Sequence, residues 1–332
     1  MASIKQNMRW SIVFVCLMMA ACAPQGVINS EENLPTVTTH PTSIVQPTSV
    51  LRLTPTVTAQ VTRTSVPTAT QSITPEATLT AESRVRMAPE DWQKWPVIPT
   101  LTESAREIYA LGQTLGNNPH AFIKVGDCES TPTWFLGDFD AGTYTLGEEY
   151  ASLQALIDTF QGSFGRTSLA AKSGFNAASV LSPFWTDRKQ CESTESPLGC
   201  EMRIMQPSFA LVTLGTNDIW DEVKFETNLR TILDELIANG VVPVLATKAD
   251  NLEGDHAINQ VIVRLAYEYD LPLWNFWLAV QDLPDKGLQE DKAHLTWGPN
   301  RLNDPLVLER AWPQRNLGAL MTLDNLWRAM EE

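Results

Sequence analysis

From about residue 100 onward, short uninterrupted apolar runs alternate with longer stretches in which apolar residues recur every three or four positions. The first pattern predicts strands buried on both faces, and the second predicts amphipathic helices. The predicted strands are 121–125, 168–171, 208–214, 241–247 and 271–276, and the predicted helices are 102–115, 148–160, 175–181, 222–239, 255–269 and 316–330. This alternation predicts a single α/β domain with a five-stranded parallel sheet covered on both faces.

The first 22 residues have the pattern of an export signal. Lys5 and Arg9 precede an apolar run over 10–21, which is too short to span a hydrocarbon layer of ~30 Å. The run ends in Met-Ala-Ala-Cys, which resembles a bacterial lipobox, so we expect Cys22 to carry a lipid such as palmitate. Ordinary cleavage after small residues is the alternative. The expected location is the bacterial cell envelope, with the chain lipid-anchored on the outer face of the cytoplasmic membrane or at the cell surface.

Residues 23–86 form a predicted linker between this anchor and the folded domain, 87–332. About half of the positions from 34 to 80 are Thr, Ser or Pro, and almost none is charged. Such a segment buries too little apolar surface to offset its ordering entropy. The sequence therefore predicts a flexible stalk.

Charge argues against two classes of partner. The first 86 residues contain six basic and four acidic residues, which leaves 18 basic and 35 acidic residues and a net charge of −17 in the rest. A domain this acidic is repelled by nucleic acids and anionic lipid surfaces. We expect no nucleic-acid partner, and membrane contact only through the lipid anchor. A monomer is favoured.

Polar motifs follow three of the predicted strands, and a fourth lies in a late loop. In parallel sheets the carboxyl ends of the strands meet at one edge, where ligands bind. The first three motifs are therefore expected to converge on that edge. The four motifs are Gly126-Asp127-Cys128, Gly174, Gly215-Thr216-Asn217-Asp218 and Asp291-Lys292-Ala293-His294.

In this order the motifs resemble the blocks of the SGNH (GDSL-type) hydrolases, over about residues 122–296. The resemblance implies a flavodoxin-like three-layer α/β/α sandwich and an esterase or acyl hydrolase activity. Cys128 stands where the family has its serine nucleophile. The motif residues that support the resemblance are Gly126, Asp127, Gly215, Thr216 and Asp218.

Acyl transfer needs a nucleophile, a base, a group that orients the base, and donors for the oxyanion. Cys128 is the candidate nucleophile, His294 the base, and Asp291 the group that orients the imidazole. The backbone N–H groups of Cys128 and Gly174 and the side-chain amide of Asn217 are the candidate oxyanion donors. Glycine is expected at 174 because it lets the backbone approach closely.

The cysteine count bears on the state of Cys128. If Cys16 leaves with the signal and Cys22 is lipidated, Cys128, Cys191 and Cys200 remain. The last two flank a short polar loop and are expected to form a disulfide, which leaves Cys128 as the odd thiol. A thiol beside a histidine is a strong nucleophile, but an oxidised or inert Cys128 remains an alternative.

The expected function is hydrolysis of an acyl ester, a small molecule or an acyl group on an extracellular glycan. A catalytically silent domain that binds carbohydrate or envelope polymer is one alternative, and an acyltransferase is another. Lys248 and Asp250, after the fourth strand, are candidate substrate contacts. No spacing suggests a metal site, and no cofactor is expected. Three tryptophans close to the motifs would suit sugar stacking or core packing equally: Trp134, Trp220 and Trp297.

Overall fold

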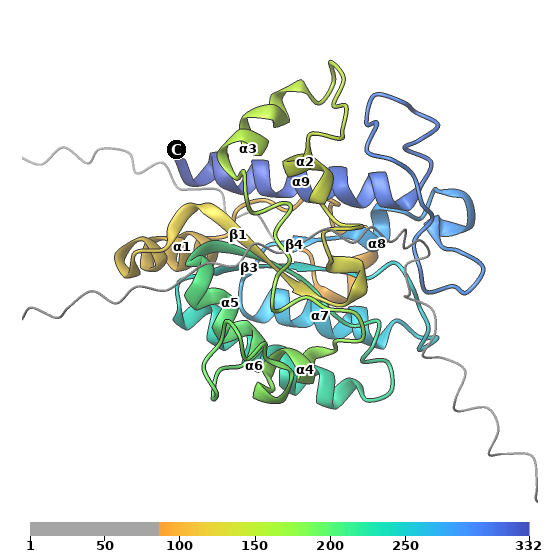
Figure 1. Cartoon of the computed structure of the whole chain (residues 1–332). Coiled ribbons are helices and arrows are strands. Elements are labelled where there is room, and N and C mark those ends of the chain that lie inside the picture. The colour runs from red at the N-terminus through yellow and green to blue at the C-terminus, as the bar shows by residue number, and fades with distance from the viewer. Residues whose placement is uncertain (1–85, 332) are drawn as a thin grey trace, which may run out of the picture. The chain divides into compact units, whose positions relative to one another are not determined.

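The computed structural model describes residues 86–331 (Figure 1). The predicted signal peptide and lipobox (1–22) and the stalk up to residue 85 lie outside these residues. Between residues 86 and 331, no helix is both long and apolar enough to cross a membrane.

The sheet is parallel throughout, with its strands in the order β1-β2-β3-β4. The strands are β1 (Asn118–Gly126), β2 (Pro207–Thr213), β3 (Val242–Ala246) and β4 (Leu273–Trp274). The predicted strand 168–171 is reduced to a single parallel bridge from Ala171 to Gly126. It is short because the N–H of Ala171 bonds back to Ser168 in a local turn. Including this bridge beside β1, the order is that of a flavodoxin-like sheet.

Helices cover both faces of the sheet, which confirms the three-layer α/β/α architecture. Figure 1 shows α2, α3 and α9 on one side and α4, α5, α6 and α7 on the other. The α-helices are α1 (Glu103–Leu115), α2 (Gly137–Ala141), α3 (Gln154–Thr159), α4 (Ala177–Leu181), α5 (Pro197–Met205), α6 (Glu222–Ala238), α7 (Ala257–Glu268), α8 (Phe276–Ala279) and α9 (Ala311–Glu331). Short 3-10 helices are η1 (Pro89–Lys94), η2 (Cys128–Ser130), η3 (Ala151–Leu153), η4 (Pro183–Trp185) and η5 (Pro284–Gly287).

Several boundaries differ from the sequence prediction for local reasons. The predicted helix 148–160 is split into η3 and α3. The fifth predicted strand is only two residues long because the side chain of Asn275 caps α8 directly after it. Sequence reasoning missed α5, although Ser196 at the N-cap and Pro197 at the first helical position are standard start signals.

The core is built around β2 and the last six residues of β1, which are buried on both faces almost throughout. Phe122 on β1 packs edge-on against Phe164, and Phe160 contacts both Phe122 and Phe209 of β2. One ionisable group is buried close to these aromatic residues. Lys124 is 1% exposed, and its Nζ donates to the carbonyl oxygens of Phe164 (2.7 Å) and Phe135 (3.4 Å).

Candidate active site

Three of the four motifs leave the sheet side by side. Gly126, the last residue of β1, pairs with Ala171 on one edge and with Thr213, the last residue of β2, on the other. Neighbouring strands lie about 4.8 Å apart. The segments that begin with Asp127, Lys172 and Leu214 therefore start at the same level of the sheet, as the sequence predicted.

The turn after β1 requires glycine at its first position. A Cβ on Gly126 would lie 2.0 Å from Ser130 Oγ and 2.7 Å from Thr213 Oγ1. Ser130 Oγ instead hydrogen-bonds Thr213 Oγ1 at 2.5 Å, and the Asp127 carboxylate accepts the N–H of Glu129 at 2.9 Å. Cys128 opens the resulting 3-10 turn, η2, with its side chain half-buried and its thiol outside the disulfide.

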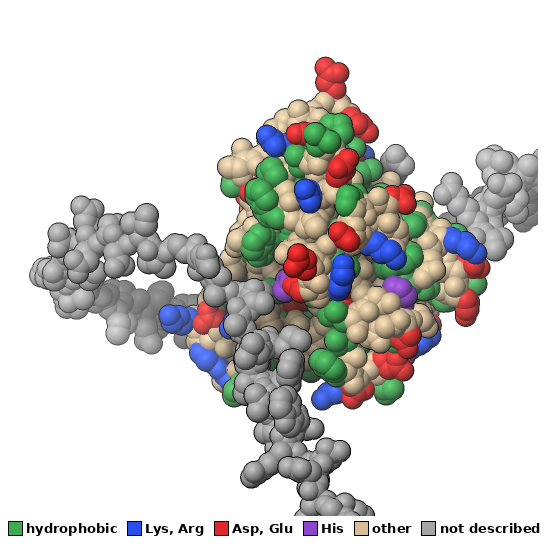
Figure 2. Space-filling model, turned by 90° about the vertical axis from the view of Figure 1, so that its right-hand side faces the viewer, with side chains coloured by type: hydrophobic (Ala, Val, Ile, Leu, Met, Phe, Trp, Pro, Cys, Tyr) green, Lys and Arg blue, Asp and Glu red, His purple; other side chains and the backbone are tan. Residues whose placement is uncertain are grey.

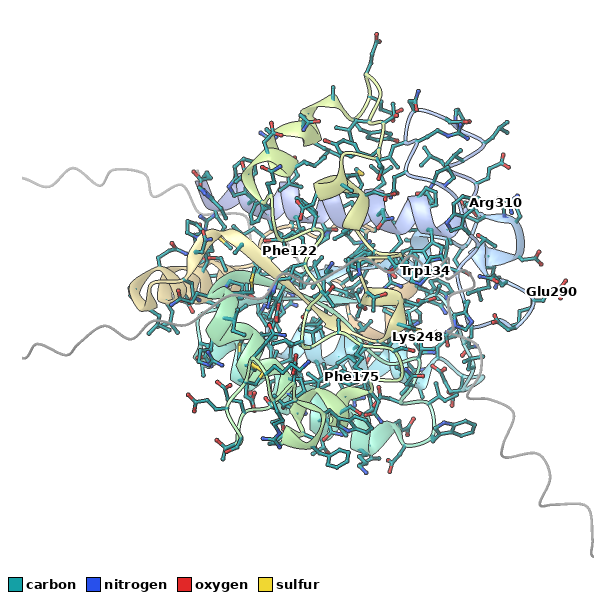
Figure 3. All side chains as sticks on the ribbon, viewed as in Figure 1. Phe122, Trp134, Phe175, Lys248, Glu290 and Arg310 are labelled. Carbon is teal, nitrogen blue, oxygen red and sulfur yellow. A yellow bond between two sulfur atoms is a disulfide. The ribbon has the colours of Figure 1, made fainter. Side chains whose placement is uncertain are left out.

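The fourth motif forms a tight hairpin. Leu288 and Leu295 form an antiparallel bridge, and the N–H of Gln289 donates to the carbonyl of His294 at 2.8 Å. Lys292 takes the left-handed conformation (φ 58°) at the tip. Glu290 belongs to this hairpin, and Figure 3 labels it at the right-hand edge of the molecule.

Within this hairpin Asp291 orients His294. One carboxylate oxygen accepts the backbone N–H groups of Ala293 and His294, each at 3.0 Å. The other lies 2.6 Å from His294 Nδ1. Burial acts to raise the pKa of Asp291, but the hydrogen bonds from His294 and its backbone hold that pKa below its usual value. An ionised Asp291 favours the proton on Nδ1, which leaves Nε2 able to accept a proton.

Glu129 joins two segments, the turn of residues 127–130 that carries Cys128 (here the nucleophile turn) and the hairpin of residues 288–295 that carries His294 (the histidine hairpin). Its Oε1 accepts the N–H of Leu295 at 3.3 Å, and its Oε2 accepts a hydrogen bond from Arg315 of α9 at 2.8 Å. The residue after Cys128 is thus bonded to the residue after His294. The structure brings together the two segments that carry the predicted nucleophile and base.

The second and third motifs are bound to each other. The carboxylate of Asp218 accepts the N–H of Ala177 at 3.1 Å, and Asn217 Nδ2 donates to the carbonyl of Phe175 at 2.9 Å. Burial raises the pKa of Asp218 to about 6, although the bond from Ala177 opposes this. Asn217 is therefore anchored next to Gly174 with its side chain exposed.

Gly174 is a glycine for a different reason from the one expected. A Cβ at this position would meet nothing within 4 Å, so close approach of other described atoms does not require glycine. Its φ of +81° does, because side chains rarely adopt that conformation. This geometry leaves the backbone at residue 174 exposed at the edge of the sheet.

Lys248 and Asp250 support the third motif from beneath. Lys248 Nζ bonds Asp250 Oδ1 (2.5 Å) and Glu253 Oε2 (2.6 Å), and Thr216 Oγ1 donates to Asp250 Oδ2 (2.8 Å). Lys248 is 8% and Asp250 2% exposed. Both side chains are buried and bonded within the protein, and their contact with substrate stays a prediction.

The tryptophans near the motifs are exposed rather than part of the core. Trp220 is 89%, Trp297 62% and Trp134 45% exposed, and Trp134 stacks on Trp312. Figure 3 labels Trp134 and Lys248 toward the same side of the molecule as Glu290. Figure 2 looks onto that side, where charged groups of both signs are interspersed with hydrophobic side chains.

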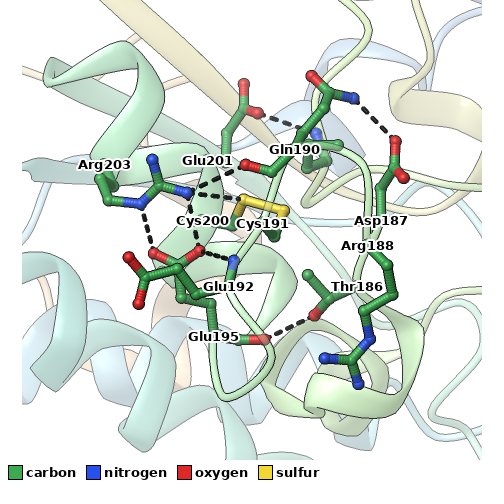
Figure 4. The surroundings of a disulfide bond; sticks show 12 residues. Thr186, Asp187, Arg188, Gln190, Cys191, Glu192, Glu195, Cys200, Glu201 and Arg203 are labelled. Carbon is green, nitrogen blue, oxygen red and sulfur yellow. Dashed lines mark hydrogen bonds and ion pairs between the residues drawn. A yellow bond between two sulfur atoms is a disulfide. The ribbon is translucent and has the colours of Figure 1, made fainter. Parts of the chain in front are cut away.

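The predicted disulfide between Cys191 and Cys200 is present (Figure 4). Beside it Arg203 forms an ion pair with Glu195. Among residues 86–331, the one cluster with the composition of a metal site is Cys191, Glu195 and Cys200. Because both sulfurs are in the disulfide, neither is a thiolate ligand, and this cluster is not a metal site.

No protein-family model matches the chain, and no curated protein matches it. Among solved structures it is similar to a psychrotrophic esterase from Pseudoalteromonas sp., with 18% identity, a TM-score of 0.38, and coverage of 64% of this chain and 100% of that one. It is similar to a putative lipolytic protein of the G-D-S-L family from Desulfitobacterium hafniense (13%, TM-score 0.38, 61% and 99% covered). It is also similar to a catalytic mutant of an acetylxylan esterase from Geobacillus stearothermophilus (12%, TM-score 0.37, 64% and 97% covered).

Proposed function

We propose that this protein is an ester hydrolase in which Cys128, His294 and Asp291 form the catalytic triad. The observation that carries the proposal is the oriented Asp291–His294 pair, on a hairpin that is hydrogen-bonded to the residue after Cys128. The order of the motifs, which resembles that of the SGNH hydrolases, supports the same assignment.

In the proposed reaction, His294 Nε2 takes the proton of the Cys128 thiol, and the thiolate attacks the carbonyl carbon of the ester. The N–H groups of Cys128 and Gly174 and the amide of Asn217 donate to the oxyanion. The imidazolium then protonates the leaving alcohol, and a thioester forms on Cys128. His294 next takes a proton from a water molecule, which attacks the thioester carbonyl carbon and releases the acid, with the Cys128 thiolate as leaving group. The imidazolium then returns the proton to the thiolate.

The test uses purified protein and a panel of short acyl esters. Cys128→Ala should abolish hydrolysis, and Asp291→Asn should lower kcat while changing KM little, because the aspartate orients the base. Cys128→Ser should keep a fraction of the activity, because the base and oxyanion donors remain. Wild-type hydrolysis by Cys128→Ala would refute the triad.

Two other outcomes identify the alternative functions. If the wild type cleaves no ester in the panel but binds an acylated polysaccharide, the domain is a silent binding module. If adding an acceptor alcohol diverts most of the acyl group from water to that alcohol, it is an acyltransferase.

We also propose that the acyl group is carried by an extracellular glycan. Exposed tryptophans near the site support this, because indole faces stack on sugar rings, and Trp220 and Trp297 are the most exposed of the three. Trp220→Ala should raise KM for an acetylated polysaccharide without changing hydrolysis of a small aryl acetate. An equal effect on both substrates would contradict the glycan assignment.

The proposed location is the outer face of the cell envelope, through a lipid on Cys22. The support is in the sequence alone: a charged start, a short apolar run and a lipobox-like ending. Cys22→Ser should release the protein into the medium or leave it unprocessed. A mutant that is processed and membrane-bound as before would refute the anchor.

A further inference from the structure

Glu129 and Arg315 form a buried ion pair between the nucleophile turn and the histidine hairpin. Their side chains are 12% and 6% exposed, and Glu129 Oε2 accepts from Arg315 Nη1 at 2.8 Å. The other carboxylate oxygen accepts the N–H of Leu295. A single carboxylate therefore contacts both the hairpin and α9, from the position directly after Cys128.

Arg315 is itself held in a fixed place. Its guanidinium lies 4.9 Å from the ring centre of Phe135 and 5.5 Å from those of Phe276 and Trp312. The N–H of Trp312 also donates to the carbonyl of Thr296 at the base of the hairpin. Helix α9 thus provides a rigid support to which both catalytic segments are attached.

Stability alone does not explain such a pair. Removing two charges from water costs several kcal/mol each, and apolar residues of similar size often replace a buried pair without loss of stability. Here the carboxylate accepts a bond from the residue that follows the proposed base. A loss of alignment of ~1 Å between nucleophile and base is enough to slow a reaction about 100-fold.

We propose that Glu129 and Arg315 are positioning residues that hold His294 in register with Cys128. The inference rests on the proposed function, since it concerns the geometry of the proposed triad. Glu129 fixes the hairpin through Leu295, and Arg315 holds Glu129 against α9.

The charges around Glu129 give this role a pH dependence. Burial raises the pKa of Glu129 to about 7; Arg315 and His294 act against that rise, and Asp127 and Asp250 add to it. Asp127, Glu129, Lys248 and Arg315 line part of a small cavity of about 20 Å3. It has room for about one water molecule. Protonation of Glu129 removes the charge that pairs with Arg315, so positioning should weaken as the pH falls through about 7.

The test replaces the pair by apolar residues, Glu129→Leu with Arg315→Met, and uses Glu129→Gln as a second variant. The readouts are the melting temperature, kcat and KM on a short ester, and the rate of Cys128 alkylation by iodoacetamide between about pH 5 and 9. The double variant should melt near the wild type, but its kcat and its alkylation rate near neutrality should fall about 10- to 100-fold with KM little changed. Glu129→Gln keeps an acceptor for the N–H of Leu295 and should retain more activity than the double variant. Its alkylation rate should lose the part of the decline at low pH that comes from protonation of Glu129.

The matched control is Glu195→Leu with Arg203→Met. Glu195 also pairs with an arginine and accepts a backbone N–H, that of Glu192 at 2.8 Å, but beside the disulfide (Figure 4). This control should leave alkylation of Cys128 unchanged.

The outcomes separate the two proposals. Wild-type kcat and alkylation in a folded Glu129→Leu, Arg315→Met protein would overturn the positioning role. If that variant fails to fold, Glu129→Gln decides, and an alkylation profile identical to the wild type overturns the role. If the wild type cleaves no ester but Cys128 is alkylated more slowly in the variants than in the wild type, the positioning role is supported and only the hydrolase is refuted. If Cys128 of the wild type reacts with iodoacetamide no faster than glutathione does, the positioning role is overturned as well.

Discussion

Lys124 offers a direct measurement of the cost of a charge inside the core. It lies on β1, the strand that carries Cys128 at its end, and it is 1% exposed. Burial lowers the pKa of Lys124 from 10.5 to about 7, and the carboxylates of Asp140 and Glu201 only partly oppose this. The perturbation is Lys124→Met, which keeps an unbranched side chain of similar size and removes the titrating group.

The magnitude follows from proton linkage. Above about pH 7 the folded chain has released this proton, whereas the unfolded chain holds it up to 10.5. The folded state therefore binds fewer protons, and the free energy of unfolding rises with pH over this window. At 1.36 kcal/mol per pH unit, a folded pKa of about 7 predicts a gain of about 2.5 kcal/mol between about pH 6 and pH 9 from Lys124 alone.

The assay is urea unfolding of the wild type and of Lys124→Met at several pH values across that window. The two carbonyl oxygens that lose their donor should cost the variant roughly 1–3 kcal/mol each, independently of pH. From about pH 6 to pH 9, the free energy of unfolding of the wild type should therefore rise by about 2.5 kcal/mol relative to that of Lys124→Met.

A matched control separates burial from the loss of any lysine. Lys224 is exposed on α6, and the curve of Lys224→Met should run parallel to that of the wild type. If the curves of Lys124→Met and the wild type are also parallel to within about 0.5 kcal/mol, the linkage argument is refuted.

Three further predictions address the scaffold of the site. Gly126→Ala should lower the free energy of unfolding by about 1–3 kcal/mol and also reduce kcat, because its Cβ would lie 2.0 Å from Ser130 Oγ; wild-type melting and turnover would contradict the contact. Replacing Cys191 and Cys200 by alanine should lower the melting temperature and reduce the free energy of unfolding by about 2–3 kcal/mol, as expected for so short a loop. Peptide mapping that joins Cys128 to either of these cysteines would overturn this pairing and the triad. A shortened chain that begins at Arg86 should melt as the full chain does, because Arg86 keeps its ion pair with Asp270; a large drop would show that the residues before it pack on the domain.

Local patterns in the sequence were sufficient for the architecture. Continuous apolar runs such as 208–214 predict buried parallel strands because such strands are covered on both faces, and β2 is indeed buried almost throughout. Thr102 and Gly240 mark the ends of α1 and α6 through capping rules that depend on neighbouring residues only. The convergence of the motifs followed from topology, because parallel strands end at one edge.

The pairing of Asp291 with His294 was also within reach of the sequence, since the two residues are three apart and a tight turn brings them together. The role of Glu129 was not, because its partners Leu295 and Arg315 lie 166 and 186 residues away. A glutamate after a cysteine has no local signal that distinguishes an exposed side chain from a buried one. Only the packing of α9 against the sheet decided that Glu129 points inward, because burial and long-range ion pairs depend on the assembled layers and not on neighbouring residues.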